Sequence, residues 1–158
     1  MSDKKAPDDI KVLVRNKKAR HDYTVEQTIE AGIQLRGSEV KSLREAHASI
    51  SDAYAMARNG ELWLMQLQIN EYAWAHHFQH EPKRERKLLL HRREIDDLAD
   101  AVNAKGYTLL PLEIYLKKGK VKILLGLCKG KQQHDKRESE KERTAKREMD
   151  REINRHRR

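Results

Sequence analysis

Cysteine, long apolar runs and catalytic signatures are scarce or absent in this chain of 158 residues. The single cysteine, Cys128, cannot form a disulfide within the chain, which excludes a disulfide framework and fits a reducing compartment. The first ten residues lack the apolar core of a secretory signal. No apolar run approaches the roughly 20 residues that a membrane helix needs. We therefore expect a cytoplasmic protein without a membrane segment.

Known catalytic motifs are missing as well. The chain has no G-x-S-x-G, no P-loop and no G-x-G-x-x-G. His21–Asp22 and His134–Asp135 are neighbours in sequence, which leaves a small general acid–base ribonuclease as an alternative. His76 and His80 are four residues apart and would suit a metal on a helix, but further ligands are not obvious. We expect no enzyme activity, no metal site and no cofactor.

Positive charge is present in excess. Lys and Arg number 34 against 25 Asp and Glu, a formal net charge of +9, and 37% of residues are charged. Only 37% are hydrophobic, so part of the chain must be solvated. A basic excess favours a polyanionic partner, nucleic acid before an anionic membrane. Lysines that only keep the protein soluble are the alternative.

The middle of the chain reads as an antiparallel sheet. Odd-numbered apolar residues from Tyr23 to Leu35 predict one face of a long strand, bent near Gln27 or Gly32. Ser38 is a plausible N-cap for the short helix that follows. Asn59-Gly60 and Lys118-Gly119 each separate two alternating runs and predict hairpins. In the second hairpin, Leu112, Ile114, Leu116 and the odd positions 121–127 are expected to share one buried face.

An amphipathic helix separates the two hairpins. Ile95, Leu98, Ala99 and Val102 follow helical spacing, and Gly106 is placed as its C-terminal cap. About six strands and one or two helices then favour a mainly β fold, a small antiparallel barrel. We divide the chain into a disordered N-terminus (1–11), the barrel (12–129) and a tail (130–158).

The tail has no proline, no aromatic residue and almost nothing to bury. From Lys129 onward it has twelve Lys or Arg and seven Asp or Glu, a net charge of +5. Its composition favours a helix, and its only apolar residues are Ala145, Met149 and Ile153. Such a narrow stripe does not offset backbone ordering of about 1–2 kcal/mol per residue. We predict a segment that is disordered alone and helical on a charged partner; a solubility tail is the alternative.

Three basic clusters flank the predicted sheet, at residues 16–21, 83–87 and 117–120. Cations on loops can reach phosphates without disturbing a core. Three clusters around one small fold favour a shared anionic surface, whose binding would weaken steeply with salt. The candidate cations of the first two clusters are Lys17, Lys18, Arg20, Lys83, Arg84, Arg86 and Lys87.

Five ordered motifs carry a family resemblance. They are "NKKARHDY", "EAGIQLRGSEVKSLR", "ISDAY", "KRERKLLLHRREI" and "KGKQQHDKR". Together they resemble the small protein B family, the SsrA-binding proteins of bacterial trans-translation, over about residues 12–140. The resemblance implies an oligonucleotide-binding (OB)-fold-like barrel that binds the tRNA-like domain of transfer-messenger RNA (SsrA RNA).

The resemblance also implies partners for both parts of the chain. The barrel would help deliver the alanyl-charged RNA, with elongation factor Tu, to stalled ribosomes. The tail would become helical in the empty messenger channel and decoding centre of the small subunit. A ribosomal or other structural RNA-binding protein with a basic tail is the alternative function.

Residue by residue, the resemblance implies a set of RNA contacts. Glu30 could accept from base-edge amino groups or orient a neighbouring cation, although an exposed strand residue fits the alternation equally well. By composition alone Leu90 is a core residue. Gln132 and Ala145 depart from the pattern of the family, and Met149 and Ile153 could supply the apolar anchor of the tail. The implied contacts are Asn16, Lys17, Arg20, Glu30 and Leu90 on the RNA, with Gly130, Lys131, His134, Asp135, Lys136 and Arg137 in the tail.

Overall fold

The computed structural model describes residues 9–157 apart from 76, 78 and 132, and of residues 133–136 it describes only the backbone. Nine strands and four helices follow one another in this part of the chain. Their bounds, in chain order, are β1 Ile10–Arg15, α1 Lys17–Asp22, β2 Tyr23–Ile33, α2 Gly37–Arg44, β3 Ala48–Ser49, β4 Tyr54–Arg58, β5 Glu61–Met65, β6 Gln68–Ile69, β7 Arg86–Leu89, α3 Arg92–Lys105, β8 Thr108–Lys117, β9 Lys120–Gly130 and α4 Gln133–His156.

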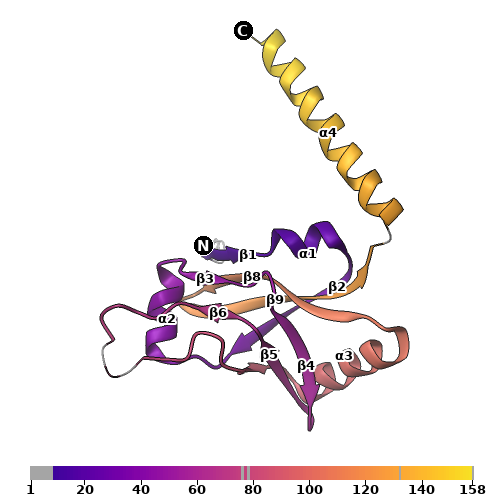
Figure 1. Ribbon diagram of the computed structural model, residues 1–158. Coiled ribbons are helices and arrows are strands. Elements are labelled where there is room, and N and C mark those ends of the chain that lie inside the picture. Colours follow the sequence, from indigo (N-terminus) through magenta and orange to yellow (C-terminus); the bar gives the residue numbers. More distant parts are fainter. Residues whose placement is uncertain (1–8, 76, 78, 132, 158) are drawn as a thin grey trace, which may run out of the picture.

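An antiparallel sheet forms the body of the protein (Figure 1). The strand order is β1-β8-β4-β5-β7-β2-β9, and β9 pairs again with β8, so that six of the strands form a ring. Strands β4 and β8 meet only where Ala55 pairs with Leu109, and β1 extends the sheet beyond β8. Strands β3 and β6 form a separate pair. The predicted antiparallel sheet is confirmed, with more strands than the six expected.

Both predicted hairpins are confirmed. Asn59 and Gly60 have φ angles of 54° and 74°, and Lys118 and Gly119 have φ angles of 51° and 77°. Two consecutive residues with positive φ are what a two-residue turn of type I′ requires, and its twist matches that of the flanking strands. The turns therefore set the registers of β4 with β5 and of β8 with β9.

A bulge divides β2 into two halves. Val25 pairs with Cys128 and Gln27 with Leu127, so one residue of β2 has no opposite number. After an extra residue, odd-numbered side chains point to the opposite face of the sheet from the odd-numbered side chains before it. Tyr23 and Val25 accordingly pack on a small outer cluster, whereas Ile29 and Ala31 pack on the main core inside the ring. The prediction that these residues share one face was wrong.

A second bulge, between Pro111 and Glu113, has the same effect in β8. Leu112 joins the outer cluster with Cys128, while Ile114 packs in the main core, so they do not share the predicted face. Gly126 on β9 makes room for the bulge, because a Cβ added there would lie 2.9 Å from Leu112 Cδ1. The odd positions of β9 do line the main core, as expected.

Helix α3 matches its prediction, whereas the start of α2 does not. Ile95 and Leu98 are buried, and Gly106 ends α3 in the left-handed conformation with φ 65°. The N-cap of α2 is Arg36, and Ser38 lies inside the helix and is buried. The Ser38 hydroxyl bonds to the ring of His80 instead of capping the helix.

Two boundaries and one element near the chain ends differ from expectation. Ile10 and Lys11, assigned to a disordered terminus, belong to β1, and residues 1–8 lie outside the described residues. Helix α1 replaces the expected loop. At the other end β9 runs to Gly130, and the Lys131 N–H donates to the Asp22 carbonyl. The tail therefore starts slightly later than composition indicates, because Gly130 is still paired in β9.

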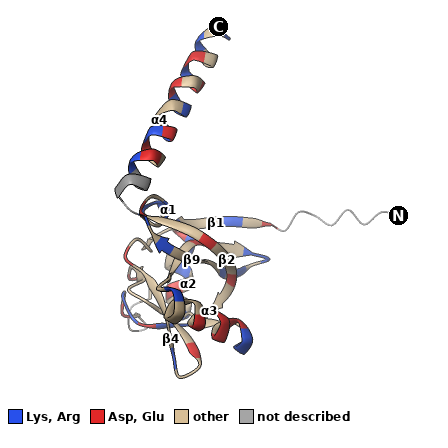
Figure 2. Cartoon of the chain, turned by 90° about the vertical axis from the view of Figure 1, so that its right-hand side faces the viewer, with Lys and Arg blue, Asp and Glu red and all other residues tan. Residues whose placement is uncertain are grey.

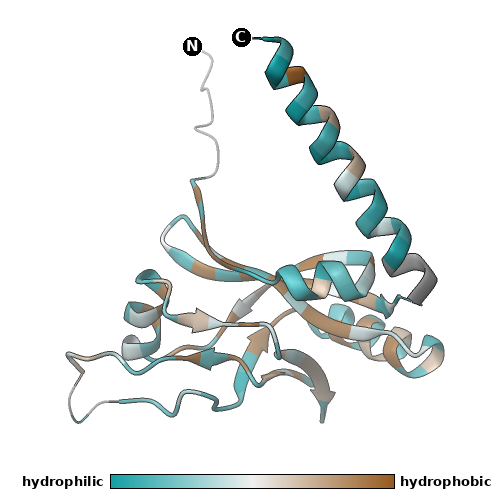
Figure 3. Ribbon diagram, turned by 45° about the horizontal axis from the view of Figure 1, so that its top comes forward, coloured by the Kyte–Doolittle hydropathy of each residue, from teal (hydrophilic) through white to brown (hydrophobic). Residues whose placement is uncertain are grey.

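The tail is the long helix α4, which projects away from the sheet (Figure 1). Blue and red residues alternate along it in Figure 2, and it is hydrophilic with few brown positions in Figure 3. Met149 and Ile153 are exposed on it. The expected helical preference is confirmed, while disorder in the absence of a partner stays a prediction. No helix in the described part of the chain is both long and apolar enough to cross a membrane.

Candidate nucleic-acid interface

Asn16 anchors α1 to the sheet and is not itself at the surface. Its side chain is only 2% exposed. The Asn16 Oδ1 accepts from the Ala19 N–H at 3.0 Å, which caps the helix. The Asn16 Nδ2 donates to the Pro111 carbonyl at 2.9 Å and to the Ile50 carbonyl at 3.2 Å. Asn16 therefore positions the cations of α1, and the expected direct RNA contact does not fit this burial.

The cations of α1 face solvent. Lys17, Lys18 and Arg20 are exposed, while Ala19 packs beneath them in the outer cluster. Lys18 lies 3.6 Å from Asp52, and Arg20 lies 3.8 Å from Glu113. Pairs this long, with the cation exposed, contribute little, and the cation can exchange its partner for a phosphate. The helix thus presents a basic surface on a rigid support.

Glu30 lies on the exposed face of β2 with polar neighbours. It accepts a hydrogen bond from the Tyr115 hydroxyl, and Lys117 Nζ lies 3.4 Å from its carboxylate. These two donors, Tyr115 first, hold the pKa of Glu30 below its usual range. The carboxylate is therefore ionised, and it orients Lys117 at the hairpin tip, as one of the two expected roles requires.

One cation of the cluster at residues 83–87, Arg86, is internal. Arg86 is 0% exposed, donates to Glu39 and also bonds to the carbonyls of Leu67, Pro82 and Arg84. Such a guanidinium cannot reach a phosphate, so its assignment to the RNA contacts was wrong. It lies on β7 and not on a loop, and its ion pair with Glu39 of α2 keeps the buried charge from being left without a partner.

Arg84 shares the same partner. Its Nε and Nη2 donate to Glu39 Oε1 at 2.9 and 2.6 Å. Burial alone would raise the pKa of Glu39, but hydrogen bonds from the Arg36 N–H, Arg86 and Arg84 outweigh it and hold that pKa below its usual range. Lys87 lies 3.1 Å from Glu61. Lys83 is exposed and remains a candidate.

The three basic clusters lie at two ends of β2. Helix α1 immediately precedes the first residue of β2, whereas residues 83–87 and 117–120 lie near its last residues. Arg84 Nη2 contacts the Gln34 carbonyl just beyond β2. At about 3.3 Å per residue, the eleven residues of β2 give a contour of roughly 35 Å between the ends. The clusters therefore form two groups, one at each end of β2, which we call the two basic surfaces, and a shared anionic partner stays a prediction.

Leu90 follows β7 and is partly buried against the main core. This agrees with the interpretation from composition and leaves a part of its surface accessible. The neighbouring Leu89 is the more exposed of the two, at 47%. Contact between Leu90 and RNA stays a prediction.

The base of the tail is held against α1. Lys131 Nζ contacts the Arg20 carbonyl at 3.5 Å. His21 lies between two carboxylates, with Nδ1 2.8 Å from Asp22 and Nε2 2.9 Å from Glu140 of α4. These two hydrogen bonds, Asp22 first, raise the pKa of His21. Both ring nitrogens are occupied within the protein, which argues against His21 as a general base.

The structure describes only some of the other candidate residues of the tail. Gly130 ends β9 opposite Tyr23, and Arg137 is exposed on α4. The side chains of His134, Asp135 and Lys136 lie outside the described residues, as does Gln132. Ala145 is exposed in line with the stripe formed by Met149 and Ile153.

His80, one of the two histidines considered as a metal pair, is already hydrogen-bonded within the protein. His80 is 2% exposed, and it bonds through Nδ1 to the Ser38 hydroxyl at 2.9 Å and through Nε2 to the Ile69 carbonyl at 2.8 Å. His77 is exposed, and His76 lies outside the described residues. Because both nitrogens of His80 are used, its role is to hold the loop on α2.

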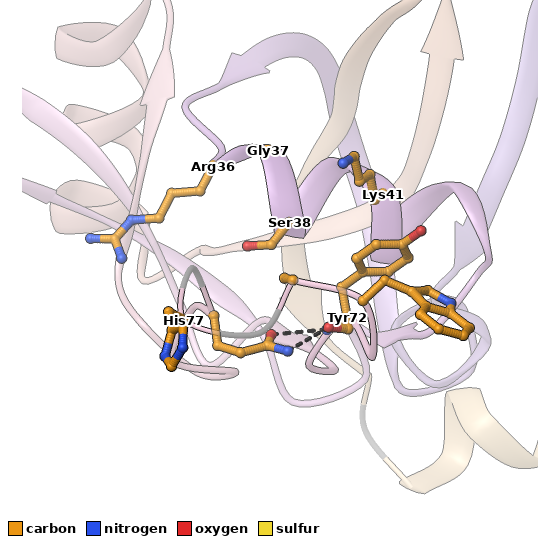
Figure 4. Close-up of a pocket in the computed structure, with 9 residues that line it drawn as sticks. Arg36, Gly37, Ser38, Lys41, Tyr72 and His77 are labelled. Atoms are coloured by element: carbon orange, nitrogen blue, oxygen red, sulfur yellow. Dashed lines mark hydrogen bonds between the residues drawn. The ribbon is translucent and has the colours of Figure 1, made fainter.

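A hollow of about 600 Å³ beside α2 was not found from the sequence (Figure 4). Arg36, Lys41, Tyr72 and Trp74 are among its lining residues. Trp74 is 75% exposed, in a polar stretch where composition alone favours a core aromatic. A tryptophan flanked by Glu71, Tyr72 and several histidines was the available signal.

Taken together, the basic helix on the sheet, the ionised strand carboxylate and the cationic tail define a nucleic-acid-binding protein that lacks a catalytic centre among its described residues. The comparisons with known proteins agree. A family model described as SmpB protein matches residues 13–155. The chain belongs to the SmpB family, whose members are non-enzymatic RNA-binding proteins.

Individual relatives are similar over most of the chain. An SsrA-binding protein of Rhodopseudomonas palustris (strain BisB5) is 54% identical over 90% of this chain and 91% of its own length. One from Bacillus cereus (strain B4264) is 52% identical over 88% and 90%. A solved structure described as "tmRNA-SmpB: a journey to the center of the bacterial ribosome" is 44% identical, with a TM-score of 0.66, covering 78% of this chain and 87% of that one.

Proposed function

We propose that this chain binds SsrA RNA and brings it to stalled ribosomes for trans-translation. The observation that carries the proposal is the match, across nine-tenths of the chain, to proteins named for SsrA binding. The geometry supports it, since an exposed basic helix is fixed by a buried asparagine to a rigid sheet. The protein would act in the cytoplasm.

The ring of strands acts in this proposal as a small OB-fold-like barrel for the tRNA-like domain. Lys17, Lys18 and Arg20 contact phosphates, which position an RNA without reading its sequence. Glu30 accepts from base-edge amino groups or acts through Lys117, and Leu90 adds apolar contact. Lys83 belongs to the second basic surface. Asn16 and Arg86 serve the interface by positioning α1 and β7.

The tail has a separate role. We divide the chain into an RNA-binding body and a tail that begins just after β9, and we assign the tail to the messenger channel and decoding centre of the small subunit. Elongation factor Tu, bound to the alanyl-charged RNA, is the further partner. A cationic segment of single-helix width suits a channel walled by RNA, where the folded body has no room.

The test is to sequence the RNA that accompanies the protein when it is purified from its own cells. Stoichiometric SsrA RNA is the expected result. Recovery of intact ribosomal subunits without SsrA RNA would instead support a structural ribosomal protein. Incubation of labelled RNA with the chelator-treated protein completes the test, because any turnover would argue against a purely binding function.

A further inference from the structure

The hollow beside α2 differs in charge from hollows elsewhere on the protein. Its described lining includes Arg36 and Lys41 and no Asp or Glu. In the hollows beside α1 and along α4, by contrast, carboxylates offset the Lys and Arg side chains. Neither Arg36 nor Lys41 forms an ion pair with any residue that the structure describes, whereas Lys18, Arg20, Lys87 and Lys117 all do. The hollow is thus a place for an anion.

Aromatic surface accompanies these cations. Trp74 has the largest exposed fraction of the large hydrophobic side chains in the described residues, 75%. Lys41 Nζ lies 5.6 Å from the centre of the Tyr72 ring. Figure 4 shows Arg36 on one side of the hollow and Lys41 with Tyr72 on the other. An exposed indole and a partly exposed phenol can stack a base, and the cations near them can hold its flanking phosphates.

The hollow is built and not a gap left by a loose loop. The Tyr72 N–H donates to Gln79 Oε1 at 3.1 Å, and Gln79 Nε2 donates back to the Tyr72 carbonyl. His80 then joins the loop to α2 through Ser38. The buried contacts of Glu39 with Arg84 and Arg86 join the same two segments further along. Polar contacts therefore fix both ends of the aromatic segment relative to Arg36 and Lys41.

We propose that this hollow binds one unpaired nucleotide of SsrA RNA, with its base on Trp74 and Tyr72 and its flanking phosphates on Arg36 and Lys41. The inference rests on the proposed function and extends it to a second RNA contact. SsrA RNA is the occupant, because Glu30 and Leu90, which the proposed function assigns to that RNA, lie towards the same end of β2 as α2. The tail, which is assigned to the ribosome, leaves the body from the opposite end of β2.

The test measures binding of full-length protein to SsrA RNA and follows tryptophan fluorescence. The chain has two tryptophans. Trp63, on β5, is half-buried with the guanidinium of Arg58 5.0 Å from its ring, so Trp63→Phe is the matched control. SsrA RNA should quench fluorescence in wild-type and Trp63→Phe protein, and the quenching should be largely lost in Trp74→Phe protein.

Affinity gives a second readout. Trp74→Ala should weaken binding to SsrA RNA about tenfold, or ~1.4 kcal/mol, and Trp74→Phe should restore most of it. Arg36→Ala and Lys41→Ala should each reduce the slope of log K against log salt by about 0.7. Melting curves of the Trp74, Arg36 and Lys41 variants should match wild type, because the changed side chains are exposed or line an open hollow.

Three outcomes would overturn the inference. Wild-type affinity in Trp74→Ala, together with unquenched Trp74, would show that no base stacks there. Quenching by small-subunit ribosomal RNA but not by SsrA RNA would assign the hollow to the ribosome. Absence of any SsrA RNA binding by wild-type protein would reject the proposed function itself, a result distinct from the first two.

Discussion

Arginine has opposite uses at different positions in this protein. Arg20 on α1 is exposed, whereas Arg86 is enclosed and saturated with protein acceptors. The two residues look alike in the sequence, since each lies in a basic cluster. What separates them is Glu39, which is distant in sequence and becomes a partner only in the folded chain. A tally of cations therefore overestimates the surface available to RNA.

Arg86→Ala should destabilise the protein strongly. Removing one partner of a buried ion pair leaves Glu39 facing fewer donors and typically costs about 3–5 kcal/mol. Urea unfolding followed by circular dichroism measures the loss of unfolding free energy. Lys83→Ala, which removes an exposed cation from the same segment, should stay within about 0.5 kcal/mol of wild type. Equal effects of the two substitutions would contradict the structural role of Arg86.

Cys128 is a structural residue of β9. It is fully buried in the outer cluster. Burial raises the pKa of its thiol to about 11. The thiol is therefore protonated at neutral pH and has little nucleophilic character.

At the scale of elements, turns and helix ends that depend on local sequence were predicted correctly, whereas elements that depend on tertiary contacts were not. Asn59-Gly60, Lys118-Gly119 and Gly106 act through their own backbone angles, so the sequence reveals them. Helix α1 has only six residues and depends on a capping asparagine that is itself held by Pro111 and Ile50. A helix this short is not stable by itself. The local sequence pattern alone therefore did not predict helix α1.

The contact between α1 and α4 should depend on pH. The pKa of His21 is raised, and its protonated ring can donate to both Asp22 and Glu140. The stabilisation is fully present below the ordinary pKa of 6.5 and is lost as pH rises through the raised value. Glu140→Gln should lower the pKa of His21, measured by NMR titration of the ring protons. An unchanged pKa would show that α4 does not rest on α1 in solution.

The apolar stripe of α4 should matter only when the tail has a partner. Met149 and Ile153 are 65% and 50% exposed. The double substitution Met149→Glu and Ile153→Glu should leave the melting temperature and the affinity for SsrA RNA unchanged. It should reduce trans-translation activity, measured as the tagging of peptides on stalled ribosomes, at least tenfold. Lys141→Glu with Lys146→Glu, away from the stripe, is the comparison for charge alone. Full tagging by the first double variant would mean that the stripe has no role.

For the whole molecule, the two basic surfaces lie at opposite ends of β2. The site could be predicted from sequence only as motifs: the cations of α1 and Glu30 were correctly placed at the surface, whereas Asn16 and Arg86 proved to be internal. The hollow beside α2 was missed because Arg36 and Trp74 are far apart in the chain. Their proximity depends on the buried contacts between α2 and the loop.

Truncation after Lys131 should separate the two parts of the proposed function. This end point keeps the pairing of Gly130 with Tyr23 and the bond from Lys131 to Asp22. The shortened protein should unfold like wild type and bind SsrA RNA within about threefold, but it should not support tagging in a reconstituted translation assay. A loss of RNA affinity comparable to the loss of tagging would show that body and tail are not separable.

The bulge in β2 has a consequence for how this sequence can vary. One extra residue lets a single strand serve two hydrophobic clusters on opposite faces. Deleting Glu26 would remove the bulge but would turn the side chains of one half of the strand to the other face of the sheet. Either Ile29 and Ala31 would leave the main core, or Tyr23 and Val25 would leave the outer cluster, and polar neighbours would take their places. The number of residues in β2 is thus constrained more tightly than the identity of residue 26. Many side chains can occupy this exposed position, but the position cannot be deleted.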